Sequence, residues 1–370
     1  MMAHEKAGGK PEQVARIRGS GNRVYQQVIQ LNSEPEQERR YAVYSSTAPS
    51  SLPDLEHSAM LADSTRRRLS AAASACLTWI AKAQNPDGGL PTDDHGTPSC
   101  TWTTAGLLWA SSCYGVDTNA AWSRRAGAWL LDQLSDDGGL PTVRVGDPTT
   151  TDATAQALLA AINYVDDGDP RFPRIARWLI HSQDDAGGWS WLRWDDDPRV
   201  ASTSFAILAL QAYSRSCTDT TGDASTAVAA AVRWLQATQN SDGGWGDVPA
   251  AVSRPSSTGL ATLALSSWPG TQDHRMAAGD FITDAFDDGW VNGLERPSSH
   301  TIIRLGIPYA MLGLTSTPHQ RHFETAAQAV PHLLRDYLQD CFVLSGTRTR
   351  SWPTRDGLLA IGSLLRAGVQ

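Results

Sequence analysis

The sequence predicts an all-α protein in which six helical hairpins close a double ring, an (α/α)6 toroid in a single domain. A unit of two helices recurs about every fifty residues. The first helix of each unit carries tryptophan, whereas the second is rich in alanine and leucine. An acidic turn and a Gly-Gly pair separate the two helices in four of the copies. Such a hairpin cannot bury its apolar face alone, so neighbouring hairpins must stack, and six are enough to close a ring.

The four clear copies share one plan. A tryptophan in the first helix is usually followed five residues later by glutamine, then by the acidic turn and the glycines. These copies span Cys76 to Thr92, Ala126 to Thr142, Ile175 to Trp191 and Ala230 to Asp247. Their tryptophans are Trp79, Trp129, Trp178 and Trp234, and their glutamines are Gln84, Gln183 and Gln239, with Leu134 in the second copy. Two weaker copies lie around Phe281 to Trp290 and around Leu333.

The second helix of each unit is expected in the inner ring. These helices should begin near Thr104, Thr154, Thr203, Thr258, after His300 and near Asp356. The glycine pairs are Gly88-Gly89, Gly138-Gly139, Gly187-Gly188 and Gly243-Gly244, and all four should turn at one end of the ring. Glycine is favoured there because a chain that leaves a helix often adopts positive φ.

The spacing of Trp or Phe, Gln and Gly-x-Trp resembles the QW repeats of squalene–hopene and oxidosqualene cyclases and of the related prenyltransferase β-subunits. The resemblance covers about residues 66 to 366. It implies a toroid with concentric inner and outer helix rings. The resemblance is more specific for this fold than for any one reaction.

Length, composition and net charge limit the domain organisation and the kinds of partner that the chain can have. With 370 residues, 41% of them hydrophobic, the chain is long enough for one large domain or two small ones, and the repeats favour one barrel over residues 61–370. Residues 1–60 are rich in Gly, Ser, Pro, Glu and Gln, so we expect an arm that is partly disordered or wrapped on the barrel. A net charge of -8 argues against nucleic acid as a partner.

Location and assembly are less constrained. The five cysteines lack disulfide-like or CxxC spacing, which favours free thiols and a cytoplasmic protein. No run is apolar enough to span a bilayer and no signal peptide is evident, so membrane contact should be peripheral at most. The oligomeric state stays open.

Asp152 opens an apolar helix at Thr149 to Ala160. An aspartate at the mouth of a buried helix caps it, is paired, or is held ready for chemistry. Spacing alone favours the cap, because aspartate is a common N-cap residue.

The family resemblance shifts that balance. The oxidosqualene cyclase motif Asp-Cys-Thr-Ala-Glu-Ala-Leu is similar to the run from Asp152 to Leu158, and it implies that Asp152 is the proton donor of a class II terpene cyclase. Those enzymes usually supply His or Cys from the next inner helix to polarise the acid. The corresponding positions here hold Phe205 and Ser202. Ser202 can donate a hydrogen bond to the carboxylate, whereas Phe205 cannot.

Aromatic and polar residues near the inner helices are candidates for binding the substrate. The tryptophans in the loops that feed these helices are Trp102, Trp189, Trp191, Trp194, Trp290 and Trp352. Each alone is explained by packing, but as a set they suggest an aromatic-lined pocket that stabilises a cation. His300, near Arg296 and Arg304, faces the cavity or the rim, and Asp356, beside Trp352, is a reserve acid. The expected substrate-binding residues are Trp102, Trp191, Trp194, Phe205, Trp290, His300, Trp352 and Asp356.

No cofactor is expected. Asp195-Asp196-Asp197 could hold a divalent cation with a diphosphate, but a solvated loop is the favoured interpretation. Magnesium would therefore be needed only for a diphosphate substrate. The chain has no Asp-x-Cys, which argues against the zinc site of protein prenyltransferases.

The sequence thus predicts an isomerase, a proton-initiated class II terpene cyclase. Its substrate would be an isoprenoid or meroterpenoid alkene or epoxide, smaller or more polar than squalene because there is no room for a second barrel. Asp152 would be the general acid. The alternative is a non-catalytic or partner-dependent toroid, similar to a prenyltransferase β-subunit, that binds an isoprenoid or a peptide.

Overall fold

The computed structural model describes residues 61–115, 120–193, 197–217, 222–287, 306–343 and 349–368. The arm expected at residues 1–60 lies outside them. Inner-ring helices are α3 (Thr101–Tyr114), α5 (Thr151–Ala161), α7 (Val200–Ser216), α9 (Pro255–Leu265), α11 (Gly306–Thr315) and α14 (Ser351–Ala367). Outer-ring helices are α2 (Asp63–Ala83), α4 (Ala121–Asp132), α6 (Arg171–His181), α8 (Asp223–Ala237), α10 (Gln272–Asp287), α12 (Gln320–Gln328) and α13 (Val330–Arg335).

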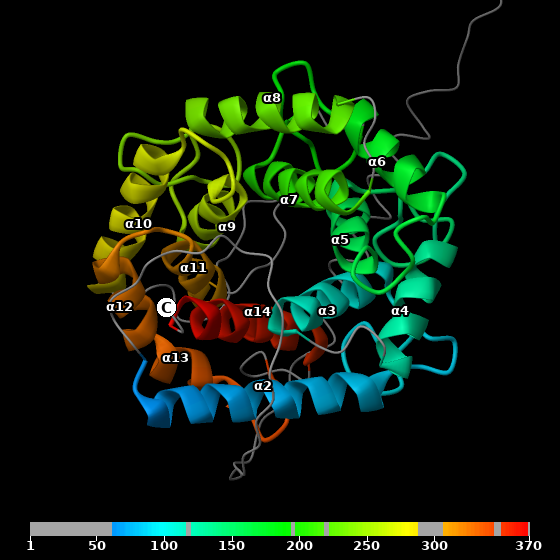
Figure 1. Ribbon diagram of the computed structural model, residues 1–370, viewed down its shortest axis with the longest axis horizontal. Coiled ribbons are helices and arrows are strands. Elements are labelled where there is room, and N and C mark those ends of the chain that lie inside the picture. The colour runs from blue at the N-terminus through cyan, green and yellow to red at the C-terminus, as the bar shows by residue number, and fades with distance from the viewer. Residues whose placement is uncertain are drawn as a thin grey trace, which may run out of the picture.

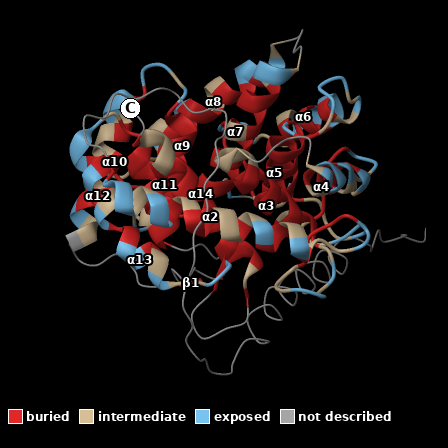
Figure 2. Ribbon diagram, turned by 60° about the horizontal axis from the view of Figure 1, so that its bottom comes forward, coloured by how far each residue is buried: buried red, intermediate tan, exposed pale blue. Residues whose placement is uncertain are grey.

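The inner ring is closed. Each inner helix contacts the next one along the chain, and α14 returns to contact α3 (Figure 1). The outer helices surround this ring, and their outward faces are the exposed ones (Figure 2). The predicted all-α double ring is therefore confirmed.

Burial explains the difference between the two rings. Every residue of α5 and α11 is buried, and so is every residue of α9 after Pro255, as an inner helix with apolar residues on all sides requires. The outer helix α6 instead buries one face, with Phe172, Ile175, Ala176 and Leu179 at helical spacing. Helices that start near the predicted threonines are the inner ones, as expected from the repeat.

A threonine ties each glycine turn to the inner helix that follows. In four repeats its hydroxyl accepts a hydrogen bond from the backbone N–H just after the Gly-Gly pair, at 2.8–2.9 Å. The pairs are Leu90 with Thr104, Leu140 with Thr154, Trp189 with Thr203 and Trp245 with Thr258. These repeated contacts show that the four turns are structurally equivalent.

The two glycines of each turn have different roles. The first has positive φ, between 85° and 100°, in all four turns. The second lies against the outer helix of the next repeat: a Cβ on Gly139 would lie 2.6 Å from the indole of Trp178, and one on Gly188 2.9 Å from that of Trp234. Packing between neighbouring hairpins therefore explains the repeated tryptophans of the outer ring, as predicted.

The glutamine of the repeat joins three segments. The side-chain amide of Gln183 donates to the carbonyls of Gly187 and Ala227, both at 2.8 Å. It thereby links its own helix end to the glycine turn and to the next outer helix. Gln84 and Gln239 make the same pair of bonds in their repeats.

Replacing Gln183 by leucine should therefore lower the free energy of unfolding by about 1–3 kcal/mol, because two carbonyls lose their donor. The matched control is Gln133→Leu in the second repeat, where Leu134 already occupies the glutamine position. Gln133 reaches only the carbonyl of Trp129 in its own helix. Urea unfolding of both variants checks this, and equal losses would contradict the proposed link.

The sixth repeat departs from the all-α prediction. A short antiparallel hairpin, β1 (Tyr337–Leu338) and β2 (Cys341–Phe342), stands where the other repeats have the glycine turn. The sequence has no Gly-Gly pair at this place, and Gln339 adopts positive φ in the hairpin turn. The link to the inner helix is nevertheless kept, since the N–H of Phe342 donates to the hydroxyl of Thr354 at 3.0 Å.

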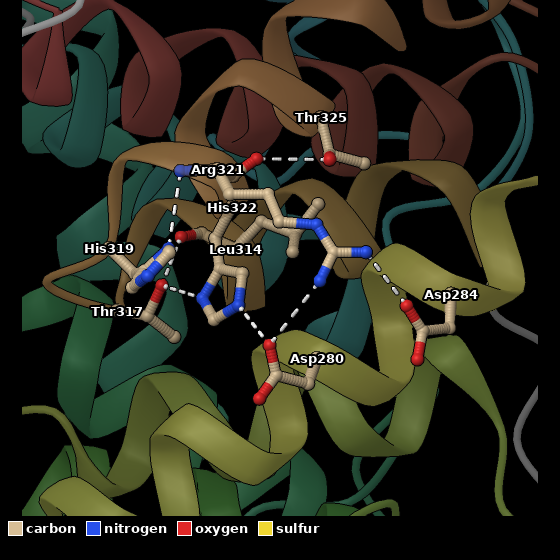
Figure 3. Close-up of polar contacts among 8 residues, drawn as sticks. All are labelled: Asp280, Asp284, Leu314, Thr317, His319, Arg321, His322 and Thr325. Carbon is tan, nitrogen blue, oxygen red and sulfur yellow. Dashed lines mark hydrogen bonds and ion pairs between the residues drawn. The ribbon is translucent and has the colours of Figure 1, made fainter.

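His322, in the outer helix α12, connects that helix to the outer helix α10 and to Thr317, just after the inner helix α11 (Figure 3). Its Nδ1 lies 2.8 Å from the hydroxyl of Thr317, and its Nε2 lies 3.1 Å from a carboxylate oxygen of Asp280. Gly279 makes room for the ring, because a Cβ there would lie 2.2 Å from it. Burial lowers the pKa of His322, although the hydrogen bond and charge of Asp280 raise it in part.

The buried His322 predicts that the stability of the folded protein depends on pH. Because the folded-state pKa is lowered, the unfolded chain binds protons more readily, and stability is lost as the pH falls below about 6.5. His322→Asn should cost about 1–3 kcal/mol at about pH 8 and show a shallower loss between about pH 7 and 5. Thermal unfolding of the wild-type protein and of His322→Asn across this pH range measures both the cost and the loss. The control is His181→Asn, because His181 is exposed. An unchanged slope would show that His322 does not titrate in this window.

All five cysteines are free, as predicted. No described helix is long and apolar enough to cross a membrane.

Candidate active site

The inner helices begin beside one another at one end of the ring. The N–H of Thr151 donates to the carbonyl of Trp191, which precedes the next inner helix, and that of Val200 donates to Asp247 in the same way. The N–H of Ser351, at the start of α14, donates to Asp93, which precedes α3 and so closes the circle. Side chains in the first turns of these helices are thereby brought together from distant parts of the sequence.

Asp152 is the second residue of α5 and is 1% exposed. The hydroxyl of Ser202, on the neighbouring inner helix α7, donates to its Oδ1 at 2.5 Å. Ser202 is completely buried. The predicted contact between Asp152 and Ser202 is therefore present.

Asp152 does not cap its helix. The N-cap of α5 is Thr150, whose hydroxyl accepts from the N–H of Ala153 at 3.3 Å. The capping interpretation that spacing alone favours is wrong, because the residue two positions earlier fills that role. The carboxylate of Asp152 is directed instead to the adjacent helix.

A second buried carboxylate lies in α14. The Nε of Arg355 donates to Oδ1 of Asp356 at 2.7 Å, and the hydroxyl of Tyr309 donates to the same oxygen at 3.1 Å. Burial alone would lower the pKa of Arg355, but the neighbouring Asp356, Tyr309 and Asp152 raise it overall. An arginine in contact stabilises an ionised carboxylate, which argues against Asp356 as a reserve proton donor.

Sequence reasoning missed Arg355 and Tyr309. The signal that could have found the first is a single arginine within the apolar segment from Trp352 to Leu364. A buried arginine requires a partner, and Asp356 is adjacent.

The aromatic candidates differ in their surroundings. Trp102 is half-buried, and the guanidinium of Arg355 lies 4.4 Å from its ring centroid. Phe205 is buried and meets Trp109 of α3 edge to face at 5.9 Å. Trp109 is a third residue that sequence reasoning missed, since it lies within a helix rather than in a loop.

The other tryptophans separate into three cases. Trp352 is buried at the start of α14, and Trp191 is half-buried in the loop before α7. Trp189 is not a residue of the expected rim: it is completely buried, and its indole N–H donates to the carbonyl of Leu179 at 2.8 Å. Trp194, Trp290 and His300 lie outside the described residues.

The acidic run is only partly described. Asp195 and Asp196 lie outside the described residues, and Asp197 is exposed. Within the described ranges, no three His, Cys, Asp or Glu side chains gather in a group that could hold a metal ion.

Comparison with known proteins agrees with this architecture. Residues 141–296 match the family described as the squalene-hopene cyclase C-terminal domain. No curated protein matches the chain in sequence.

Solved structures extend the likeness over most of the chain. The type II terpene cyclase MstE from Scytonema is 14% identical with a TM-score of 0.58, covering 82% of this chain and 99% of that one. ent-Copalyl diphosphate synthase from Streptomyces platensis is 18% identical with a TM-score of 0.53, covering 75% of this chain and 52% of that one. An alpha-1,6-mannanase from Salegentibacter reaches a TM-score of 0.60 at 9% identity, covering 80% of this chain and 98% of that one.

The closed double ring is similar in fold to the class II terpene cyclases. The chain therefore resembles squalene–hopene cyclases in sequence over residues 141–296, and class II terpene cyclases in fold over most of its length. Because the mannanase shares the fold as well, the reaction must be argued from the site itself.

Proposed function

We propose that the protein is a class II terpene cyclase in which Asp152 protonates an isoprenoid substrate and starts its cyclisation. One observation carries the proposal: Asp152 is buried at the start of an inner helix, leaves the capping of that helix to Thr150, and accepts a hydrogen bond from Ser202. The relatives support the reaction class, since a variant of MstE was solved with its substrate geranylgeranyl dihydroxybenzoate.

The physical chemistry suits this role. Protonation of an alkene or epoxide requires a carboxylic acid that carries its proton before the reaction, and removal from water favours that neutral form. A hydrogen bond from Ser202 favours the anion left behind, and it therefore strengthens the acid as the proton is transferred.

The carbocation formed next needs a dry, aromatic environment. Phe205 lies one turn after Ser202 in α7 and is packed on Trp109 of α3, so an aromatic pair follows the hydroxyl that contacts the acid. Aromatic faces stabilise cations through the ring quadrupole, and excluded water prevents early capture. The proposed wider set of substrate-binding residues is Trp102, Trp191, Trp194, Phe205, Trp290, His300 and Trp352.

The reaction is tested by incubating the protein with farnesyl, geranylgeranyl and epoxidised isoprenoids and analysing the products by mass spectrometry. A cyclic isomer with unchanged mass supports the proposal. Binding of an isoprenoid without any product would favour the alternative, a non-catalytic toroid.

Ser202→Ala tests the part of the site that polarises the acid. Hydrogen bonds to charged groups contribute about 1.5–3 kcal/mol, so kcat should fall by about 10- to 100-fold. The matched control is Ser204→Ala, because Ser204 is equally buried in α7 but donates to the carbonyl of Val200. Equal kinetic losses in the two variants would contradict a specific role for Ser202.

A further inference from the structure

Two buried side chains bring unpaired polar atoms together one helical turn from Asp152. Nη1 of Arg355 and Oε1 of Gln156 have no hydrogen-bond partner among the described residues, and both residues are at most 1% exposed. A Cβ placed on Gly106 would lie 3.2 Å from each of these two atoms. Helices α14 and α5 therefore direct a donor and an acceptor to the same place beside α3.

The orientation of both groups is fixed by their other bonds. Nε2 of Gln156 donates to the carbonyl of Asp152 at 3.2 Å, which leaves Oε1 as the atom directed away from that carbonyl. Arg355 is held by Asp356 through Nε and lies over the ring of Trp102. An unpaired polar atom in a buried site is costly, so a ligand that pairs both atoms gains binding energy.

The chemistry of the two atoms selects the ligand. Nη1 of Arg355 only donates, and Oε1 of Gln156 only accepts, so one group satisfies both if it can accept and donate. A hydroxyl does so. A diphosphate in its ionised form has no proton for Gln156, and it would meet the negative charge of Asp356, which already neutralises Arg355.

We infer that Arg355 and Gln156 form a binding site for the hydroxyl group of a short isoprenoid alcohol. This inference rests on the proposed function, because it names the substrate class of the same site. Gln156 follows Asp152 by four residues, so the two side chains are neighbours on one helix face. The hydroxyl thus lies about one helical turn from the proton donor, a separation that suits a short chain folded back on itself.

The test compares three substrates of equal chain length: farnesol, farnesyl diphosphate and the hydrocarbon without the hydroxyl. The wild-type protein should convert farnesol with a kcat/KM about 100-fold above that of the hydrocarbon, because a site built for a hydroxyl rejects its absence. Farnesyl diphosphate should also be the poorer substrate. Preference for the diphosphate, or equal use of alcohol and hydrocarbon, would overturn the inference.

The variant Gln156→Leu should reduce the preference for farnesol over the hydrocarbon to less than about 5-fold, mainly through KM. Gln211→Leu, which removes a buried amide from α7, is the matched control and should keep the preference. If Gln156→Leu does not fold, Gln156→Met replaces it. A preference unchanged in the Gln156 variant would show that the two polar atoms are bridged by water only.

Binding separates this inference from the proposed reaction. Calorimetric titration of Asp152→Asn with farnesol and with the hydrocarbon measures the site without turnover. If the wild-type protein forms no product while this variant still prefers farnesol in binding, the cyclase proposal fails and the hydroxyl site stands. If the wild-type protein cyclises the substrate but Asp152→Asn does not prefer farnesol in binding, the cyclase proposal stands and the hydroxyl site fails.

Discussion

Asp152→Asn is expected to lower turnover by about 10⁴-fold while leaving the fold intact, because asparagine has no acidic proton to transfer. The side chains have nearly the same shape, and the asparagine amide oxygen can still accept the hydrogen bond from Ser202. Stability should change by less than about 1 kcal/mol, since Asp152 does not cap α5. Product formation under saturating substrate, together with urea unfolding, measures both quantities.

Thr150→Ala provides the reciprocal control. It removes the hydroxyl that caps α5 and should cost about 1 kcal/mol of stability with little loss of turnover. Near-normal product formation by Asp152→Asn would exclude Asp152 as the proton donor.

The largest effect on stability is expected at Asp356. Asp356→Asn leaves the charge of Arg355 buried without its carboxylate, and the free energy of unfolding should fall by about 3–5 kcal/mol. The double variant Arg355→Met with Asp356→Leu should recover most of this loss, because it removes both charges.

A surface pair serves as the control for this prediction. Arg321 and Asp284 are joined at 2.9 Å, but both are more than half exposed, so Asp284→Asn should cost less than about 1 kcal/mol. Similar losses for Asp284→Asn and Asp356→Asn would show that burial does not determine the cost. Urea unfolding of all the variants provides the comparison.

Most of the fold could be predicted from the sequence because its determinants are local and repeated. The Gln, Gly-Gly and Thr positions make the same contacts in successive hairpins, so a pattern read in one copy describes the others. The hairpin from Tyr337 to Phe342 could not be predicted in this way, since the sixth copy lacks the glycine pair.

The candidate site was only partly predictable. The contact between Asp152 and Ser202 followed from a family motif that names both positions. Arg355 and Tyr309 have no such motif, and they meet at Asp356 only because closure of the ring packs α14 against α11 and α3. Adjacent Thr150 and Asp152 are both good capping residues, so sequence could not decide which one caps the helix.

Cyclisation of an alkene substrate in deuterium oxide tests the central claim most directly. If Asp152 carries an exchangeable proton to a substrate carbon, the cyclic product gains one non-exchangeable deuterium and is otherwise an isomer of the substrate. We expect this product from the wild-type protein and its loss in Asp152→Asn. A cyclic product without deuterium on carbon would contradict proton-initiated cyclisation by Asp152.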